Sequence, residues 1–250
     1  MLTNERHEFI LNLLDQKQTI KIQDIVDMTE ASESTIRRDL TVLENRNQLE
    51  RVFGGAVLPG RNLSEPTIKD KSTRNLEEKD SIAKLAASLI QDGDSVYLDA
   101  GTTTFQMIRY LQDKNIVAVT NGLTLVDALN EQGITTYLIG GLLKPRTGAF
   151  IGAQTIQSLK NYRFDLCFLG VNGFHLEMGY TTPDPEEAAV KKLASSLARE
   201  SYVLADHSKA DKISFAKIME LDEAVLITDS ISSELREVLE KKTTVKVGTQ

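Results

Sequence analysis

Residues 31–56 read ASESTIRRDLTVLENRNQLERVFGGA. Ser32 is a candidate N-cap, because its hydroxyl can accept a hydrogen bond from a free amide in the first turn of a helix. Ile36, Leu40 and Leu43 then recur at helical spacing, which predicts a helix with one buried face. The segment that follows, residues 49–56, contains a glycine pair and is typical of a short hairpin. A helix followed by such a wing is an arrangement that docks on DNA.

The other flanks of the predicted helix carry polar groups suited to DNA. Short hydroxyls and guanidinium groups can donate to phosphates and to base edges. The candidate DNA-contacting residues are Ser32, Ser34, Thr35, Arg37, Arg38, Thr41 and, in the wing, Arg51. On Arg37 and Arg38 alone, an ordinary surface helix that carries two arginines is an equally good interpretation.

The residues before this helix complete a three-helix arrangement. Apolar residues at helical spacing predict a first helix over residues 3–16 and a short second helix over residues 20–28. A brief turn then leads into the third helix, as in a helix-turn-helix whose third helix reads the DNA. Residues 49–53 and 56–58 can supply two strands. We therefore predict a winged helix-turn-helix DNA-binding domain over residues 1–58.

The charge of the chain limits what it can bind. The 250 residues carry 29 Lys and Arg against 36 Asp and Glu, and the net charge of -7 argues against indiscriminate polyanion binding. The first sixty residues are no exception, since they hold seven basic and ten acidic side chains. DNA binding must then depend on the local placement of charge.

The sequence also indicates a compartment. No apolar run reaches the length of a membrane span, and the first residues lack a signal-peptide pattern. The single cysteine, Cys167, permits neither an intramolecular disulfide nor a cysteine-based zinc site, which fits a reducing environment. We expect a cytoplasmic protein in which Cys167 is a buried, unreactive thiol.

The rest of the chain has the pattern of a second domain. Residues 59–75, with Pro59, Gly60 and Pro66, are predicted to be a linker that runs into it. Beyond them, short apolar segments alternate with helical stretches. Strands are expected at residues 96–98, 116–119, 136–139, 166–169, 202–204 and 224–227. This alternation predicts an α/β domain over residues 76–250, with a mainly parallel sheet covered by helices.

Polar or glycine-rich segments follow five of these strands. They are residues 99–104, 120–122, 140–141, 170–173 and 206–209. In open α/β sheets, ligands collect at the carboxyl ends of the strands. The amides and hydroxyls of residues 99–104 could cradle an anion at a helix N-terminus, although a turn with threonine caps is the alternative.

Two further pairs of charged residues are ligand candidates. Lys144 and Arg146 follow the third of these segments and could pair with a phosphate, or simply lie in a solvated loop. Glu187 and Lys191 are four residues apart near the start of a predicted helix. A simple surface ion pair therefore competes with a ligand role for these two.

No catalytic or metal-binding constellation stands out. His7, His175 and His207 lack metal-ligand spacing, and no serine lies in a nucleophile elbow. A pair formed by His207 and Asp206 could support acid–base chemistry, but adjacent side chains rarely point at each other. Lys209 could hold a phosphate or a hydroxyl, or merely neutralise Asp206. We expect neither a cofactor nor a metal.

A series of motifs resembles those of the DeoR-type transcriptional repressors of bacterial sugar metabolism. Residues 32–56 match SxSTIRRDLxxLExxxxLERVFGGA. The later motifs are DAGTTT (99–104), TNG (120–122), GG (140–141), FLGVNG (168–173), TTPDPEEAAVKK (181–192) and ADHSK (205–209). The resemblance covers residues 3–228. It implies a winged helix-turn-helix followed by a Rossmann-like sensor domain similar in fold to ribose-5-phosphate isomerase.

The resemblance also implies a ligand and partners. Members of this family generally bind a phosphorylated sugar, lose affinity for operator DNA and act as oligomers. The effector-site residues implied by the motifs are Asp99, Gly101, Thr102, Thr103, Thr104, Asn121, Gly141, Lys144, Asn172, Glu187, Lys191, Asp206 and Lys209. The chain most resembles the fructose-operon repressors of Gram-positive bacteria. That implies double-stranded operator DNA as partner, fructose 1-phosphate as effector, and a homodimer or homotetramer.

Two alternatives remain at this point. The chain could regulate a lactose or tagatose, glycerol phosphate or deoxyribonucleoside operon instead. It could also be a sugar-phosphate isomerase, whose carboxylate base would be Asp99, Asp206 or Glu187. An isomerase has no use for the first 58 residues, so we expect a regulator and not an enzyme.

Overall fold

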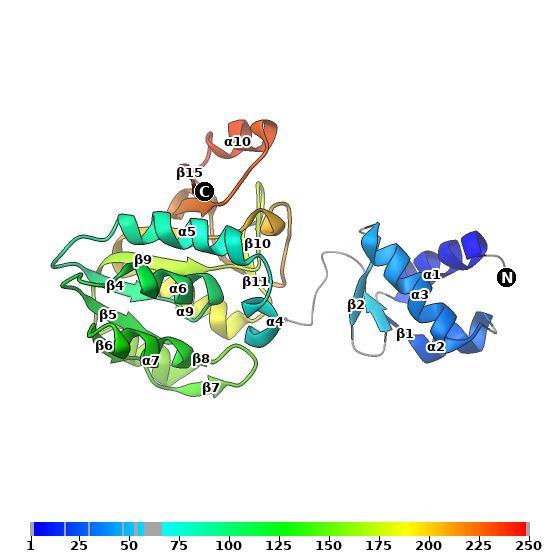
Figure 1. Ribbon diagram of the computed structural model, residues 1–250, viewed down its shortest axis with the longest axis horizontal. Coiled ribbons are helices and arrows are strands. Elements are labelled where there is room, and N and C mark those ends of the chain that lie inside the picture. The colour runs from blue at the N-terminus through cyan, green and yellow to red at the C-terminus, as the bar shows by residue number, and fades with distance from the viewer. Residues whose placement is uncertain are drawn as a thin grey trace. The chain divides into compact units, whose positions relative to one another are not determined.

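The computed structural model describes residues 3–17, 19–29, 31–46, 48–52, 55–57 and 67–248. The chain divides into two compact units, Met1–Ser64 and Glu65–Gln250 (Figure 1). In the part of the chain that the structure describes, no helix is long and apolar enough to cross a membrane.

The first unit contains three helices and a small sheet. Its elements are α1 (Thr3–Lys17), β1 (Thr19–Lys21), α2 (Ile22–Thr29), α3 (Glu33–Asn45), β2 (Glu50–Val52) and β3 (Gly55–Val57). The strands pair antiparallel in the order β1-β3-β2. The core contains the fully buried Ile10, Leu14, Ile36 and Leu40. This is a winged helix-turn-helix, as the spacing of apolar residues predicts.

The start of the second helix differs from the sequence prediction. Ile20 lies in β1 and pairs with Ala56, so α2 begins at Ile22. The two strands approach so closely at Gly55 that a Cβ atom there would lie 2.0 Å from the carbonyl oxygen of Ile20. Only glycine permits this third strand of the wing. Of the residues predicted to form the wing strands, Phe53 and Leu58 lie outside the described residues.

A seven-stranded parallel sheet forms the centre of the second unit. Its strands are β4 (Ser95–Leu98), β5 (Val117–Thr120), β6 (Thr135–Leu138), β9 (Phe164–Gly170), β12 (Ala198–Leu204), β14 (Val225–Thr228) and β15 (Val245–Val247). Their order is β15-β14-β12-β9-β4-β5-β6. The sheet confirms the six predicted strands. The seventh, β15, escaped prediction because it is three residues long and includes Lys246.

Helices cover both faces of the sheet (Figure 1). They are α5 (Leu76–Ser88), α6 (Thr102–Met107), α7 (Leu123–Glu131), α8 (Ala153–Leu159), α9 (Pro185–Ser196) and α10 (Ser233–Leu239), with short 3-10 turns η1 (Ile108–Tyr110), η2 (His207–Lys209) and η3 (Leu221–Glu223). Successive strand side chains point to opposite faces. Tyr97 accordingly packs in one core with α8 and α9, and its neighbours Val96 and Leu98 pack in the other with α5 and α7.

Two small sheets and one helix complete this unit. The sheets are β7 (Leu142–Lys144) with β8 (Ala149–Ile151), and β10 (Gly173–His175) with β11 (Gly179–Thr182) and β13 (Ala216–Met219). The helix is α4 (Ile68–Ser72), which lies inside the segment predicted to be a linker. The Ile68 amide donates to the carbonyl of Arg146 at 2.9 Å, so this part of the segment belongs to the second unit.

Candidate functional site

The N-terminus of α3 presents a cluster of hydroxyls. Ser32 is the N-cap, as predicted, and its side chain accepts from the Thr35 amide at 3.2 Å. The same Oγ atom lies 2.9 Å from the Ser34 hydroxyl and 2.8 Å from the Thr35 hydroxyl. Three hydroxyl groups, each of which can donate or accept a hydrogen bond, are therefore held close together at the start of the candidate reading helix.

The two adjacent arginines of α3 differ in their surroundings. Arg37 donates through Nε to Glu33 Oε1 at 3.0 Å, so its charge is partly compensated one turn away. Arg38 is exposed, and its guanidinium makes no hydrogen bond or ion pair among the described residues. Arg38 is thus the cation of this helix that can meet DNA without first losing a partner.

The wing is braced against α3 by two of the predicted DNA-contacting residues. Arg51 of β2 donates through Nη1 to the Thr41 hydroxyl at 2.7 Å, and its amide donates to Glu44 at 3.0 Å. The Thr41 hydroxyl in turn donates to the Arg37 carbonyl at 2.9 Å. These bonds fix the wing strand beside the reading helix.

The sequence analysis missed a buried charge cluster behind this surface. Asp39, 5% exposed, accepts from Arg6 Nε at 2.5 Å and from Arg6 Nη2 at 3.2 Å, and lies 3.1 Å from His7 Nε2. The hydrogen bond to Asp39 raises the pKa of Arg6. The signal was present, because Asp39 lies three residues after Ile36 on the buried face of the helix. The cluster joins α1 to α3 by side-chain hydrogen bonds.

Asp39→Ala should lower the free energy of unfolding of the first unit by about 3–5 kcal/mol, since it removes the buried carboxylate that pairs with the Arg6 guanidinium and contacts His7. Glu33→Ala is the matched control. It breaks an ion pair whose side chains are 53% and 57% exposed, and it should cost under about 1 kcal/mol. Denaturant unfolding of the full chain measures both. Equal losses in the two variants would contradict a structural role for the cluster.

The structure brings the five predicted strand-end segments together along the carboxyl-terminal ends of the strands of the large sheet, which we call the ligand-binding edge. They follow β4, β5, β6, β9 and β12, which are neighbours in the order β12-β9-β4-β5-β6. Because these strands are parallel, their carboxyl ends point the same way. The predicted effector residues at this edge form two groups.

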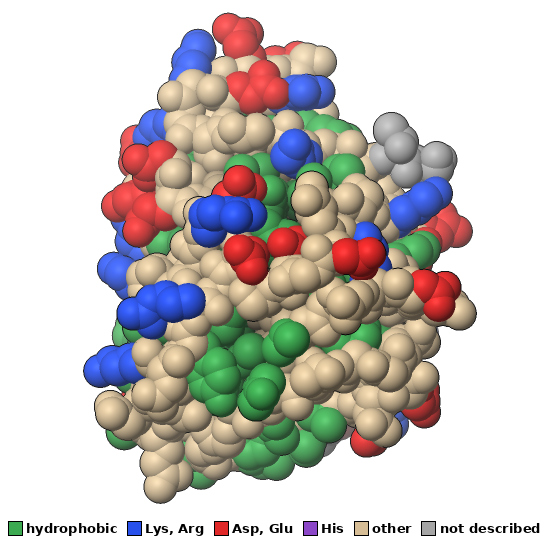
Figure 2. Space-filling model, turned by 90° about the vertical axis from the view of Figure 1, so that its left-hand side faces the viewer, with side chains coloured by type: hydrophobic (Ala, Val, Ile, Leu, Met, Phe, Trp, Pro, Cys, Tyr) green, Lys and Arg blue, Asp and Glu red, His purple; other side chains and the backbone are tan. Residues whose placement is uncertain are grey.

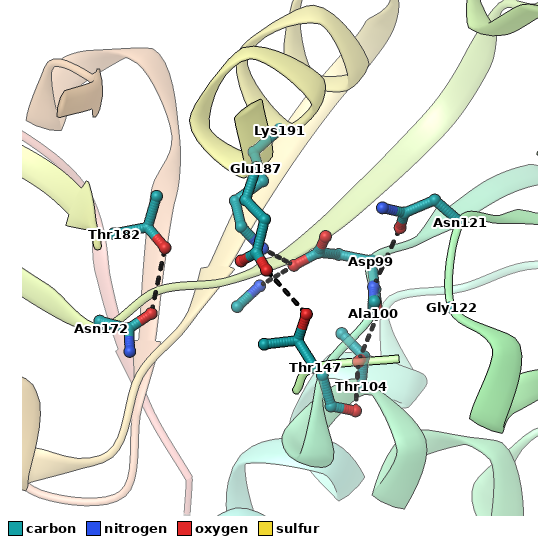
Figure 3. A network of polar contacts seen from close by, with 12 residues as sticks. Asp99, Ala100, Thr104, Asn121, Gly122, Thr147, Asn172, Thr182, Glu187 and Lys191 are labelled. Atoms are coloured by element: carbon teal, nitrogen blue, oxygen red, sulfur yellow. Dashed lines mark hydrogen bonds and ion pairs between the residues drawn. The ribbon is translucent and has the colours of Figure 1, made fainter. Parts of the chain in front are cut away.

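The first group surrounds a buried ion pair between Asp99 and Lys191 (Figure 3). These residues are 1% and 5% exposed, and the Gly170 amide donates to the same Asp99 oxygen at 3.0 Å. Burial raises the pKa of Asp99, and the charge and hydrogen bond of Lys191 oppose that shift. Lys191 therefore projects from α9 onto the end of β4.

Glu187, one turn before Lys191, has its own partners. It accepts from Lys144 at 3.0 Å and from the Thr147 hydroxyl at 2.7 Å. The interpretation of Glu187 and Lys191 as a surface ion pair is therefore wrong, because both are buried and each pairs with another element. Lys144 also contacts Asp184 at 2.8 Å, so a phosphate would have to share this ammonium with two carboxylates.

Several predicted residues shape the loops of this group (Figure 3). Asn121 accepts from the Tyr97 hydroxyl at 2.9 Å and from the Ala100 amide at 3.1 Å. Thr104 is fully buried and donates to the Asp99 carbonyl at 2.7 Å. These two side chains therefore support the loop after β4.

Other residues of the first group present unused polar groups or close contacts. Thr102 and Thr103 open α6, and their hydroxyls make no hydrogen bond within the described residues. Asn172 accepts from Thr182 at 3.2 Å. Gly101 is the N-cap of α6 in an extended conformation. Gly141 has a φ of 152°, and a Cβ there would lie 2.0 Å from the Thr155 hydroxyl oxygen.

The second group lies at the end of β12. Asp206 Oδ1 accepts from Asn75 Nδ2 at 3.0 Å and from the Ser208 amide at 3.0 Å. Lys209 is partly buried, and its ammonium makes no hydrogen bond or ion pair among the described residues. Burial lowers the pKa of Lys209, and the charge of Asp206 opposes that shift. Lys209 is a cation whose environment favours an incoming anion.

His207 and Asp206 do not pair with each other, as expected for adjacent side chains. His207 Nδ1 lies 2.8 Å from Asp229, and this hydrogen bond raises the pKa of His207. The two neighbouring side chains diverge because Asp206 caps the turn η2 and faces Ser208 and Asn75.

Two residues that support the second group from outside it, Asn75 and Lys79, are absent from the sequence prediction. Lys79 is 5% exposed and donates to the carbonyls of Lys71 and, at 2.6 Å, Arg74. Burial lowers its pKa. Lys79 precedes Ile82 and Ala83 on the buried face of α5, which is the signal that could have identified it. Within the described ranges, no group of three His, Cys, Asp or Glu side chains could hold a metal ion.

Two family models match the chain and together span most of it. The DeoR-like helix-turn-helix domain matches residues 6–62, and the DeoR C terminal sensor domain matches residues 74–230. The first match contains the reading helix and the wing. The second contains both groups at the edge of the sheet.

Relatives extend over the whole length. The uncharacterized HTH-type transcriptional regulator FruR of Bacillus subtilis (strain 168) is 47% identical over 99% of each chain. The lactose phosphotransferase system repressor of Staphylococcus aureus (strain NCTC 8325 / PS 47) is 34% identical over 98% of this chain and 97% of its own. Among solved structures, ribose 5-phosphate isomerase A from Methanocaldococcus jannaschii is similar over 55% of this chain and 56% of its own, with 20% identity and a TM-score of 0.42.

Proposed function

Since the chain belongs to the DeoR family of helix-turn-helix transcriptional regulators, we propose that it represses a fructose operon and leaves its operator when it binds fructose 1-phosphate. The name of the Bacillus subtilis relative supports fructose as the sugar. Operator DNA and a phosphorylated sugar are then its partners, and its place of action is the cytoplasm.

The observation that carries the sensing role is the Lys209 ammonium. It is partly buried at the ligand-binding edge of a parallel sheet and lacks a hydrogen-bond partner within the described residues. A phosphate would supply charge-assisted hydrogen bonds to it. α6, which begins with the unused hydroxyls of Thr102 and Thr103, packs against α5 and α4 beside this group. We propose that these three residues hold the phosphate of the effector.

The sugar hydroxyls would meet the first group. The carboxylates of Asp99 and Glu187 accept hydrogen bonds, the Lys191 ammonium donates them, and the Asn172 amide can do both. A ligand with several hydroxyls and one phosphate matches these two neighbouring groups. Asn121, Thr104, Gly101, Gly141 and Lys144 serve the site by shaping its loops and orienting Glu187.

The surroundings of the carboxylates favour a regulator over an isomerase. A catalytic base must be able to approach the proton that it removes. Asp99 is bound to Lys191, Glu187 to Lys144 and Thr147, and Asp206 to Asn75 and Ser208. Each of the three candidate bases is thus engaged with the protein itself. We propose that the site binds its sugar phosphate without converting it.

Calorimetric titration of the full chain with a panel of sugars tests this proposal. The panel contains fructose 1-phosphate, fructose 6-phosphate, ribose 5-phosphate, galactose 6-phosphate, glycerol 3-phosphate and free fructose. We expect saturable binding of fructose 1-phosphate and none of free fructose. Tight binding of another phosphate would reassign the operon, and turnover of any sugar phosphate would contradict the proposal.

We propose further that the working form is a homo-oligomer joined through the edge strand β6. Figure 2 shows hydrophobic side chains gathered on the lower part of one face of the second unit. Tyr137 and Leu138 of β6 are 49% and 40% exposed, and Leu142 of β7 is 69% exposed. Successive residues point to opposite faces, so both faces of the last strand are open.

The charge pattern favours a second copy as the occupant of this edge. Residues 134–143 contain no charged side chain, and an exposed edge strand ordinarily carries charges or proline that prevent pairing. Two copies of a chain with net charge -7 repel each other least where neither carries charge. Two-fold pairing would also give the two reading helices that an operator with two half-sites needs.

Tyr137→Lys should raise the dimer dissociation constant at least roughly 100-fold, because a two-fold axis places the new charge on both sides of the interface. Phe215→Lys is the matched control. It changes a side chain that is 74% exposed and lies outside β5, β6 and β7. Sedimentation velocity over a concentration series measures both variants. An unchanged association of Tyr137→Lys would exclude this edge as the interface.

A further inference from the structure

Residues 67–75, which we call the connector, form the first described part of the second unit after the DNA-binding unit. The connector is well organised in itself. Thr67 caps α4, since its hydroxyl accepts from the Asp70 amide at 3.1 Å and the Asp70 carboxylate accepts from the Thr67 amide at 3.0 Å. Any signal that passes along the chain between sensor and DNA-binding unit must pass through these residues.

The connector is bound to the loops that carry the proposed effector residues. The Ile68 amide donates to the Arg146 carbonyl at 2.9 Å, in the loop that includes Lys144 and Thr147. α4 also lies against α6, which begins at Thr102. At the other end, the Lys79 ammonium donates to carbonyls at the last turn of α4 and beyond it.

Asn75 makes the most specific of these connections. Its φ of 52° places it in the left-handed region, between the end of α4 and the start of α5. In this conformation its amide nitrogen donates to Asp206 Oδ1 at 3.0 Å and to the Ser208 hydroxyl at 3.3 Å. The amide thus joins the connector to the turn η2, which also carries Lys209.

A ligand at Lys209 would disturb this connection. Hydrogen bonds weaken steeply once the donor and acceptor move apart by a few tenths of an ångström beyond their normal range. The Asp206 oxygen that binds Asn75 also binds the amide of Ser208, the residue next to Lys209. A shift of η2 toward a bound phosphate would therefore change the length of the hydrogen bond between Asn75 and Asp206. A hydrogen bond to a charged group is worth roughly a 10- to 100-fold change in an equilibrium, which matches the size of ordinary allosteric coupling.

We propose that Asn75 is the positioning residue through which a sugar phosphate bound beside Lys209 changes the operator affinity of the DNA-binding unit. This inference rests on the proposed function, because it needs a ligand that releases the operator. It assigns the coupling to the amide of Asn75 and to the helix α4 that this amide anchors.

Asn75→Gly tests the proposal with little disturbance of the backbone. Glycine adopts the left-handed conformation at no steric cost, so the variant removes the amide and keeps the path of the chain. Fluorescence anisotropy gives the operator affinity with and without saturating fructose 1-phosphate, and calorimetry gives the affinity for the sugar phosphate alone. In the natural chain we expect the ligand to weaken operator binding by about 10- to 100-fold. In Asn75→Gly we expect less than about a 3-fold effect, with each separate affinity changed by less than about 3-fold.

Asp113→Gly is the matched control, because Asp113 also has a positive φ, 65°. It lies in the loop before β5, at the amino-terminal ends of the strands and away from the proposed site. It should keep the full ligand effect. A second variant, Asp70→Ala, removes the carboxylate that completes the capping box of α4 at an exposed position and should also reduce the ligand effect, so it decides the matter if Asn75→Gly does not fold.

Three results would overturn the proposal. Release of the operator from Asn75→Gly to the same extent as from the natural chain would exclude the amide as the coupling group. Loss of sugar-phosphate affinity in Asn75→Gly would make Asn75 a ligand-binding residue instead. A natural chain that binds the sugar phosphate and keeps its operator would overturn the proposed function and this inference together.

Discussion

Arg38→Ala is expected to lower operator affinity by about 30- to 25,000-fold. A bidentate arginine contact with a guanine is worth about 1–3 kcal/mol, and a dimer on two half-sites loses the contact twice. Arg38 is exposed, and among the described residues it has no partner that would have to be replaced on binding. Anisotropy titration of labelled operator DNA at fixed salt measures the loss.

Arg37→Ala is the comparison variant for this prediction. Its guanidinium is already paired with Glu33, so removing it should weaken operator binding less than removing Arg38. The affinity for the sugar phosphate should be unchanged in both variants, since the proposed sugar-phosphate site lies in the other unit. Loss of both affinities in Arg38→Ala would show damage to the fold, and retained operator affinity would remove Arg38 from the interface.

Lys209→Ala is expected to weaken sugar-phosphate binding by about 10- to 100-fold, the value of a hydrogen bond between a charged donor and a charged acceptor. Operator affinity without ligand should stay within a factor of about two, because Lys209 lies in the sensor unit and has no protein partner to lose among the described residues. Calorimetry gives the first value and anisotropy the second.

Lys212→Ala is the matched control for charge. Lys212 is exposed and lies three residues from Lys209, so its removal changes the net charge equally. Its removal should lower the affinity for the sugar phosphate by less than about 3-fold, since an exposed charge acts through water and is screened by salt. An equal loss in the two variants would mean that the effector responds to the general field of the region and makes no direct contact with Lys209.

The local parts of the structure could be predicted from the sequence. The start of α3 at Ser32 depends on a cap and on the spacing of Ile36 and Leu40, which involve neighbours along the chain. The six strands of the large sheet depend on short apolar runs with turn residues after them. The position of the candidate site at the carboxyl ends of the strands could also be predicted, because alternating strands and helices require a parallel sheet.

The partners of buried charges could not be predicted in the same way. Glu187 and Lys191 are four residues apart on one helix, and their spacing alone indicates a pair. The fold instead places Asp99 beside one of them and Lys144 beside the other. Desolvation makes an unpaired buried charge costly, so tertiary neighbours determine the pairing, and these lie 92 and 43 residues away.

The same limit explains two boundaries that the sequence did not predict. The apolar neighbours of Ile20 favour a helix, but Ile20 lies in β1 and pairs with β3, which Gly55 allows to approach closely. Residues 59–75 are expected to be a linker that runs into the second domain, and residues 67–75 belong to its first part. They are ordered by hydrogen bonds to Arg146 and Asp206, which are distant in the sequence.

The central claim is that one chain joins an operator-binding unit to a sugar-phosphate sensor that weakens the operator complex. The most direct test is the anisotropy of labelled DNA from the promoter region that the chain controls, titrated with the full chain and then with fructose 1-phosphate. The account predicts tight, saturable binding and release of the DNA by the sugar phosphate but not by free fructose. Binding that no sugar phosphate weakens would contradict it.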